Sequence, residues 1–226
     1  MVILSSDVAQ TGQLRGGVRA VEVHIPPLGL VGTLRIPDPA RALVIFVHGS
    51  GSGRLSPRNV KVAEALGVRG LATLLFDLLL GAEERDRSNV FNISLLAGRL
   101  VSVVHWIDQQ PHLRGLPLGF FGASTGAAAA LVAAASLGDR VRAVVSRGGR
   151  PDLADSALEH VKAPTLLIVG GADCGVIELN EQAFGRLKGQ KALEVVPAAT
   201  HLFEEPGAMD QVVEHAAHWF GRYLKG

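Results

Sequence analysis

The G-x-S-x-G pentapeptide at 122–126 constrains the fold more than any other part of this sequence, because it joins two apolar segments of different kinds. Residues 116–121 before it are typical of a short buried strand. The nine residues 127–135 after it are all Ala, Leu or Val and indicate a buried helix. Passing from strand to helix this quickly needs a sharp turn, and glycines leave room for the two elements to pack closely. We therefore expect Ser124 on that turn, with its oxygen projecting above a sheet.

Strands and helices alternate through most of the remaining chain. Alternation predicts right-handed βαβ units, and hence a mostly parallel sheet covered by helices on both faces. The apolar strands do not alternate with polar residues, which agrees with burial on both sides. The expected strands are 43–47, 71–76, 117–121, 141–146, 165–170 and 191–196, and the expected helices are roughly 57–68, 93–109, 125–136, 178–188 and 207–224.

The N-terminal part follows a different pattern. Segments 21–25 and 30–36 flank a Pro-Pro-Leu-Gly turn and predict an antiparallel hairpin at the sheet edge. Residues 1–18 look irregular. The longest unassigned stretch, 78–92, is interpreted as a solvated loop or as a short flap beside the site. No insertion is long enough for a cap, so we expect one α/β domain over 1–226.

A reactive serine needs a base, and the base needs an orienting acid. Asp173 follows the apolar strand 165–170, and His201 follows the strand 191–196 after a loop of small residues. Carboxyl ends of parallel strands lie along one edge of a sheet, so both side chains can reach Ser124 there. We expect Asp173 to be the acid, and Glu178 is the weaker candidate.

The glycine-rich loop at 48–53 follows another expected strand and can supply backbone N–H donors. We expect an oxyanion hole made of the N–H groups of Ser50 and Thr125. The alternative is a phosphate cradle, but the loop lacks the Gly-Lys-Ser/Thr ending and the G-x-G-x-x-G spacing of such sites. His48 is expected to be structural. No metal site is expected, because the eight histidines are scattered.

Two arginines follow the strand 141–146 and therefore lie at the same edge. Arg147 or Arg150 could bind a substrate carboxylate in a bidentate pair. The alternatives are a surface position, or pairing with Asp152 or Asp155.

Four segments together resemble the α/β-hydrolases, and within them the small, lidless dienelactone-hydrolase-like branch. They are 47–52, 122–126, 167–173 and 199–203. The resemblance covers the chain from about residue 30 to its end, and it is far more specific for the superfamily than for a substrate.

The resemblance implies a Ser-Asp-His triad on Ser124, Asp173 and His201. Dienelactone hydrolases proper carry cysteine at the nucleophile position, whereas this chain carries serine. That difference favours a general ester over a dienelactone as substrate.

Composition excludes several other classes. The net charge of +1 predicts no attraction to nucleic acid or to anionic membranes. No segment approaches the length of a membrane span. The N-terminus has no basic start and only four apolar residues, too short a run for a secretory signal. Cys174 is the only cysteine, so no internal disulfide can form, and we expect it to be a buried thiol. These features predict a cytoplasmic protein.

The sequence thus predicts a serine hydrolase that cleaves small carboxylic esters through an acyl-enzyme, without a cofactor. Thioesterase, lactonase and peptidase activity remain alternatives, because they use the same groups. A hydrolase-fold protein that binds a ligand without turnover is the alternative from another class. Neither the substrate nor the oligomeric state follows from the sequence.

Overall fold

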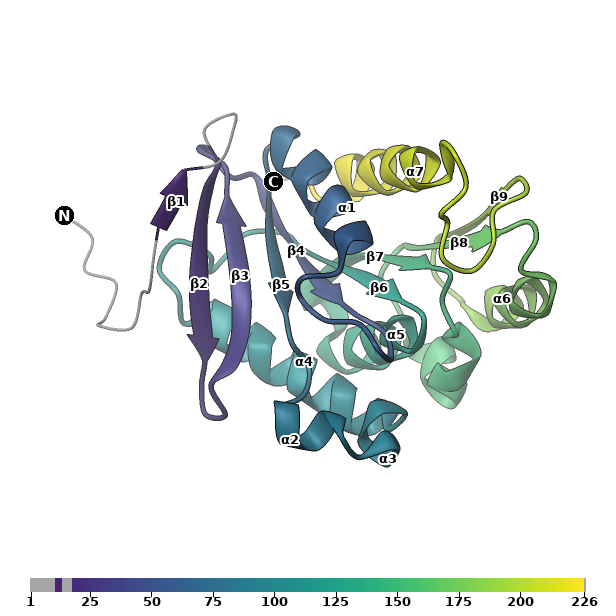
Figure 1. The fold of residues 1–226 in the computed structure, drawn as a ribbon, viewed down its shortest axis with the longest axis horizontal. Helices are drawn as coiled ribbons and strands as arrows, with labels where there is room; N and C mark the ends of the chain where they lie inside the picture. Colours follow the sequence, from purple (N-terminus) through teal and green to yellow (C-terminus); the bar gives the residue numbers. More distant parts are fainter. Residues whose placement is uncertain (1–10, 14–17, 226) are drawn as a thin grey trace.

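The computed structural model describes residues 11–13 and 18–225 of the chain, and its centre is a twisted sheet (Figure 1). Nine strands among these residues form the sheet in the order β1-β2-β3-β5-β4-β6-β7-β8-β9. All pairings from β5 through β9 are parallel, as the alternation of strands and helices predicts. The parallel strands are β4 (Ala42–Val47), β5 (Leu71–Phe76), β6 (Leu118–Ala123), β7 (Val141–Arg147), β8 (Thr165–Gly170) and β9 (Lys191–Val196).

The expected antiparallel hairpin is confirmed. Strands β2 (Arg19–Ile25) and β3 (Leu30–Ile36) pair in antiparallel register, and β3 continues the sheet by pairing with β5. The expectation that residues 1–18 are irregular is wrong at Thr11–Gln13, where strand β1 pairs with β2. The rest of that segment, apart from Val18, lies outside the described residues.

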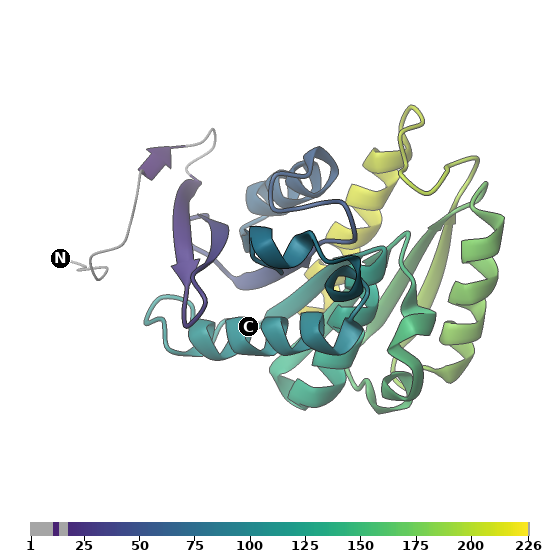
Figure 2. The ribbon, with the colours of Figure 1, turned by 60° about the horizontal axis from the view of Figure 1, so that its bottom comes forward.

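Helices cover both faces of the sheet (Figures 1 and 2). One face packs against α1 (Pro57–Val68) and α7 (Ala208–Tyr223), and the core between them contains Phe46, Phe121 and Phe220. The opposite face packs against α4 (Ile93–Asp108) and α5 (Thr125–Leu137), with α6 (Cys174–Arg186) and the 3-10 segment η2 (Pro151–His160) beside them. A second 3-10 turn, η1 (Gly138–Arg140), leads into β7.

Most of the stretch 78–92 is exposed, as the solvated-loop interpretation expects, but it also contains regular structure. It contains two four-residue helices, α2 (Gly81–Glu84) and α3 (Arg87–Val90). Asp86 between them caps the N-terminus of α3, because its carboxylate accepts from the Ser88 N–H. The Arg99 Nη2 on α4 donates to the Glu83 Oε1 on α2 at 2.7 Å, which ties α2 to α4. This stretch follows β5 and therefore stands at the carboxyl edge of the sheet.

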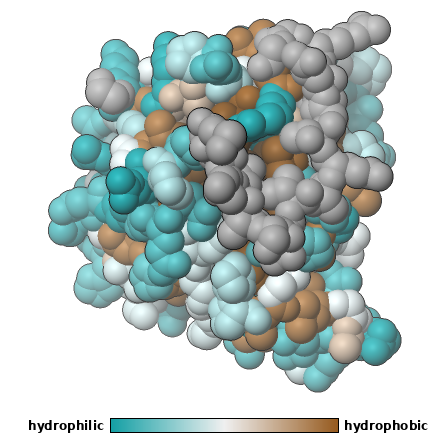
Figure 3. Space-filling model, turned by 90° about the vertical axis from the view of Figure 1, so that its left-hand side faces the viewer, coloured by the Kyte–Doolittle hydropathy of each residue, from teal (hydrophilic) through white to brown (hydrophobic). Residues whose placement is uncertain are grey.

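The surface at the β1 end of the sheet mixes hydrophilic and hydrophobic residues (Figure 3). Across the described part of the chain, no helix combines the length and the apolar character that crossing a membrane requires.

Candidate active site

Ser124 occupies the turn between β6 and α5 in a strained conformation, with φ at +51°. Two glycines make the turn possible. A Cβ on Gly126 would lie 2.1 Å from the Val47 carbonyl oxygen, and one on Gly122 would lie 2.5 Å from the Ala127 Cα. A non-glycine residue at positive φ persists only where its surroundings enforce it, and such residues concentrate at functional sites.

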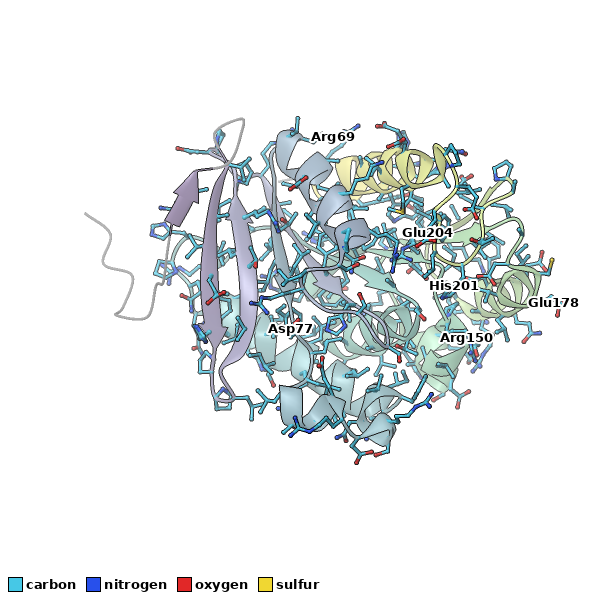
Figure 4. All side chains as sticks on the ribbon, in the orientation of Figure 1. Arg69, Asp77, Arg150, Glu178, His201 and Glu204 are labelled. Carbon is cyan, nitrogen blue, oxygen red and sulfur yellow. The ribbon has the colours of Figure 1, made fainter. Side chains whose placement is uncertain are left out.

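His201 and Asp173 form a hydrogen-bonded pair. The His201 Nδ1 lies 2.7 Å from the Asp173 Oδ2, where a protonated Nδ1 donates to the carboxylate. Each residue follows its own strand, and the two loops are joined by a bond from the Ala172 N–H to the Ala199 carbonyl oxygen at 2.9 Å. Glu178 is exposed on α6 and points away from His201 (Figure 4). The geometry therefore favours Asp173 over Glu178 as the acid.

The segment after β7 brings the serine turn and the histidine turn together. The Arg150 N–H donates to the Ser124 carbonyl oxygen at 3.0 Å. Gly148, with φ at +51°, faces the histidine turn, because a Cβ there would lie 3.0 Å from the His201 carbonyl oxygen and 3.7 Å from the His201 Nδ1. Both expected reactive groups thus flank the same four residues, 147–150.

Both expected oxyanion donors lie beside Ser124. A Cβ on Gly49 would lie 2.7 Å from the Ser124 Cβ, so the loop after β4 runs directly past the serine. The Ser50 N–H donates to the Thr125 Oγ1 at 3.2 Å. Thr125 is the first residue of α5, and its own N–H has no acceptor within the helix. A substrate oxygen would have to replace the Thr125 hydroxyl on the Ser50 N–H.

Two contacts fix the ends of this loop to the segment after β5. At one end, His48 Nε2 accepts from the Leu78 N–H at 3.1 Å, while Nδ1 lies 3.1 Å from the Gly49 carbonyl oxygen. At the other end, the Arg54 N–H and Nη1 donate to the two carboxylate oxygens of Asp77 at 2.8 and 2.7 Å. Burial lowers the pKa of His48, which keeps the ring neutral. His48 is thus engaged in holding the loop, which agrees with the structural role expected for it.

A cavity of about 730 Å³ opens beside the loop and reaches Thr125. Its wall comes from the loop after β4, the first turn of α1, the segment after β5, and helices α2, α3 and α4. The stretch 78–92 therefore borders the cavity, as the flap interpretation requires. Apolar and charged side chains both contribute to the wall, among them Leu55, Leu79, Val90, Leu96, Arg54, Arg58 and Glu84.

The two arginines expected to bind substrate are placed differently from that expectation. Arg147 is 5% exposed and is not part of the cavity wall. Arg150 is bound by Asp152, with two contacts of 2.8 Å that raise its pKa. Arg147 thus lies inside the protein, where its guanidinium contacts Asn59 on α1 and the Phe203 ring. Arg150 forms the expected alternative pair with Asp152.

One further expectation is wrong. Cys174, expected to be a buried thiol, is exposed at the first residue of α6.

The fold and the arrangement of this edge define an α/β-hydrolase. A crystal structure described as dienelactone hydrolase from Anabaena variabilis ATCC 29413 is 53% identical, with a TM-score of 0.88, and the match covers 96% of this chain and 100% of that chain. The chain therefore belongs to the dienelactone hydrolase family. No family model matches the chain.

More distant structures share the fold. Est1E from Butyrivibrio proteoclasticus is 17% identical over 90% of this chain and 98% of its own, with a TM-score of 0.75. A dienelactone hydrolase-like promiscuous phosphotriesterase from metagenomic libraries is 17% identical over 92% of this chain and 98% of its own, with a TM-score of 0.69.

Two curated relatives, from two strains of Mycobacterium tuberculosis, carry a different name. Each is 57% identical over 206 residues and is provisionally named a phosphoribosyl transferase. The match covers 91% of this chain but 46% of each relative, so the chain spans about half the length of the curated relatives it matches.

Proposed function

We propose that the protein is a serine hydrolase that cleaves small carboxylic esters, with Ser124, Asp173 and His201 as its triad. The observation that carries the proposal is that the strained Ser124 turn and the turn with the His201–Asp173 pair both pack against residues 147–150. A strained backbone conformation costs free energy, and such conformations concentrate where a side chain must be held for function. A carboxylate-bound imidazole is the usual partner of a serine nucleophile.

In the proposed reaction, the Ser124 oxygen attacks the ester carbonyl while His201 accepts its proton. Asp173 orients the imidazole and stabilises its charged form. The N–H groups of Ser50 and Thr125 bind the oxyanion, and His201 then returns the proton to the leaving alcohol. Water then cleaves the acyl-enzyme by the same route, with His201 again as the base. The reaction therefore needs only water and the chain's own residues.

The cavity supports a small or medium-sized substrate. A volume of about 730 Å³ lies within the range of small-molecule pockets, and its wall contains the expected donor Ser50. Thioester and lactone substrates fit the same groups. Neither arginine lines the cavity, and of the two we propose substrate contact for Arg150 alone, because its side chain is partly exposed. An anionic ester would have to reach beyond the cavity and replace Asp152 on Arg150.

The name of the curated relatives does not transfer to this chain. It describes proteins about twice as long, and this chain, which matches 46% of each, is 53% identical to a dienelactone hydrolase over 96% of its own length. We propose that phosphoribosyl transfer, if those proteins perform it, belongs to the part that this chain does not match.

The proposal is tested by measuring hydrolysis of p-nitrophenyl esters of increasing acyl length, together with a thioester and a lactone. We expect the short esters to be cleaved best, and Ser124→Ala to lower kcat/KM by on the order of 10³-fold or more while the fold is kept. Activity that survives Ser124→Ala would assign the reaction to other residues. Tight ligand binding without turnover by the wild type would favour the non-catalytic alternative.

A further inference from the structure

Arg147 stands at the carboxyl end of β7, almost wholly inside the protein. In the described part of the chain it forms no ion pair, and its one side-chain hydrogen bond is a long contact of 3.4 Å from Nη2 to the Asn59 Oδ1. Its Nε has no partner among these residues. Burial, and secondarily the nearby Arg58 guanidinium, lower the pKa of Arg147 to about 10, so the group stays charged at neutral pH. A buried cation without a carboxylate is unfavourable, so the contacts that it does make need an explanation.

The main contact of this guanidinium is an aromatic ring on the histidine turn. The Arg147 Cζ lies 5.7 Å from the centroid of the Phe203 ring, which is within the range of a cation–π interaction. Phe203 is 1% exposed and has φ at +57°. Its N–H donates to the Thr200 carbonyl oxygen at 3.1 Å, which closes the turn that carries His201.

The backbone of the same residue contacts the serine turn. The Ser124 N–H donates to the Arg147 carbonyl oxygen at 3.4 Å. The next residue, Gly148, packs against the histidine turn, since a Cβ there would lie 3.1 Å from the Phe203 Cε2. Arg147 therefore links the two turns directly, through its backbone on one side and its side chain on the other.

We propose that Arg147 is a positioning residue, whose guanidinium on the Phe203 ring fixes the His201 turn relative to Ser124. The inference rests on the proposed function, because it acts through the pair that would exchange a proton. Proton transfer requires hydrogen-bond reach, and a displacement of about 1 Å costs up to roughly 10²-fold in rate. Arg147 is outside the cavity wall, so its loss should lower kcat and leave KM nearly unchanged.

The test compares Arg147→Met, Arg147→Lys, Phe203→Leu and the double variant Arg147→Met/Phe203→Leu on a small neutral ester. Arg142→Met is the matched control, because Arg142 is on the same strand but exposed. Each kcat is expressed per active site titrated with a fluorophosphonate, so that misfolded protein is not counted.

We expect Arg147→Met and Phe203→Leu each to lower kcat per titrated site by about 10–100-fold, with KM within about twofold of wild type. The double variant should have about the same kcat as the less active single variant, because both changes remove the same contact. Arg147→Lys should be intermediate, since an ammonium keeps the charge but lacks the planar guanidinium. Arg142→Met should match wild type.

Wild-type kcat per titrated site in Arg147→Met would overturn the inference, and so would independent effects that multiply in the double variant. If Arg147→Met does not fold, Phe203→Leu decides, and wild-type kcat in that variant overturns the inference. A wild-type chain that fails to react with the probe overturns the proposed function and this inference together. A wild type that reacts with the probe, together with an Arg147→Met variant whose kcat per titrated site equals that of wild type, overturns this inference alone.

Discussion

The two segments that flank Ser124 are held in place by different forces. The loop at 48–54, on the oxyanion side, is fixed at its ends by polar contacts, His48 with Leu78 and Arg54 with Asp77. The segment at 197–207, on the histidine side, is fixed chiefly by close packing, and its polar contacts, Thr200 with Glu205 and Arg58 with Glu204, lie at the surface. Phe203 is buried there, and a Cβ on Gly170 would lie only 2.3 Å from the Ala199 carbonyl oxygen.

This difference predicts different sensitivities. Charges at half-exposed positions weaken as salt rises, and buried titratable groups respond to pH. Packed backbone does not respond to either, but it tolerates almost no added volume. We therefore expect salt and pH to alter the packing of the oxyanion-side loop more than that of the histidine-side segment, whose buried contacts respond mainly to mutation.

The largest expected effect concerns the acid on the histidine side. Asp173→Asn should keep the fold but favour the wrong imidazole tautomer, because an amide can donate to Nδ1. We expect kcat/KM for a neutral ester to fall by about 10²–10⁴-fold. Glu178→Gln is the matched control and should retain wild-type activity. The opposite pattern would transfer the acid role to Glu178.

A pair of glycine substitutions compares the two sides directly. Gly170→Ala places a methyl group against the backbone of Ala199, and we expect it to lower the free energy of unfolding by about 1–3 kcal/mol. Gly53→Ala, on the oxyanion side, approaches only the end of the Asp77 side chain, at 2.9 Å, which can move. Urea unfolding of both variants measures the difference. Equal losses would show that the two sides are packed alike.

Removing the charge pair should have a smaller effect, confined to the oxyanion side. Hydrogen bonds to a charged group contribute roughly 1.5–3 kcal/mol when well buried. The Arg54 and Asp77 side chains are each 24% exposed, which reduces this value. We expect Asp77→Asn to lower stability by about 1–2 kcal/mol at low salt and by less at high salt. A loss that does not depend on salt would contradict an electrostatic role.

The smallest expected effect is the pH response of His48. Its pKa in the folded protein is lowered by burial, although the Asp77 and Glu84 carboxylates oppose the shift. Below the ordinary pKa of about 6.5 the unfolded chain binds this proton more readily, so stability should fall as the pH drops from there. His48→Gln should remove this contribution, which is at most about 1.4 kcal/mol per pH unit. Unfolding curves at pH 7.5 and 5.5 test it, and identical pH dependence in both proteins would argue against a depressed pKa.

The parallel strands and the large helices were predictable, because apolar runs of strand length alternate with helical ones and glycines separate them. The candidate pair at 173 and 201 was predictable for the same reason, since each residue lies in the loop that follows a strand at one sheet edge. The position of Ser124 on a sharp turn was predictable because Gly122 and Gly126 flank it. The close packing of β6 and α5 leaves no room for a side chain at either position.

Features that depend on distant parts of the chain could not be predicted. Burial of Arg147 depends on Phe203 and Asn59, which lie far away in sequence. Exposure of Cys174 depends on how α6 is covered, which its own sequence does not specify. The bond between the Ser50 N–H and the Thr125 hydroxyl likewise arises only when the two loops meet.

The most direct test of the central claim is to treat the wild-type chain with a fluorophosphonate and locate the adduct by peptide mass spectrometry. The account predicts a single adduct on Ser124, absent from Ser124→Ala and strongly slowed in His201→Ala. An adduct on a different serine, or no reaction with a wild type that still cleaves esters, would contradict it.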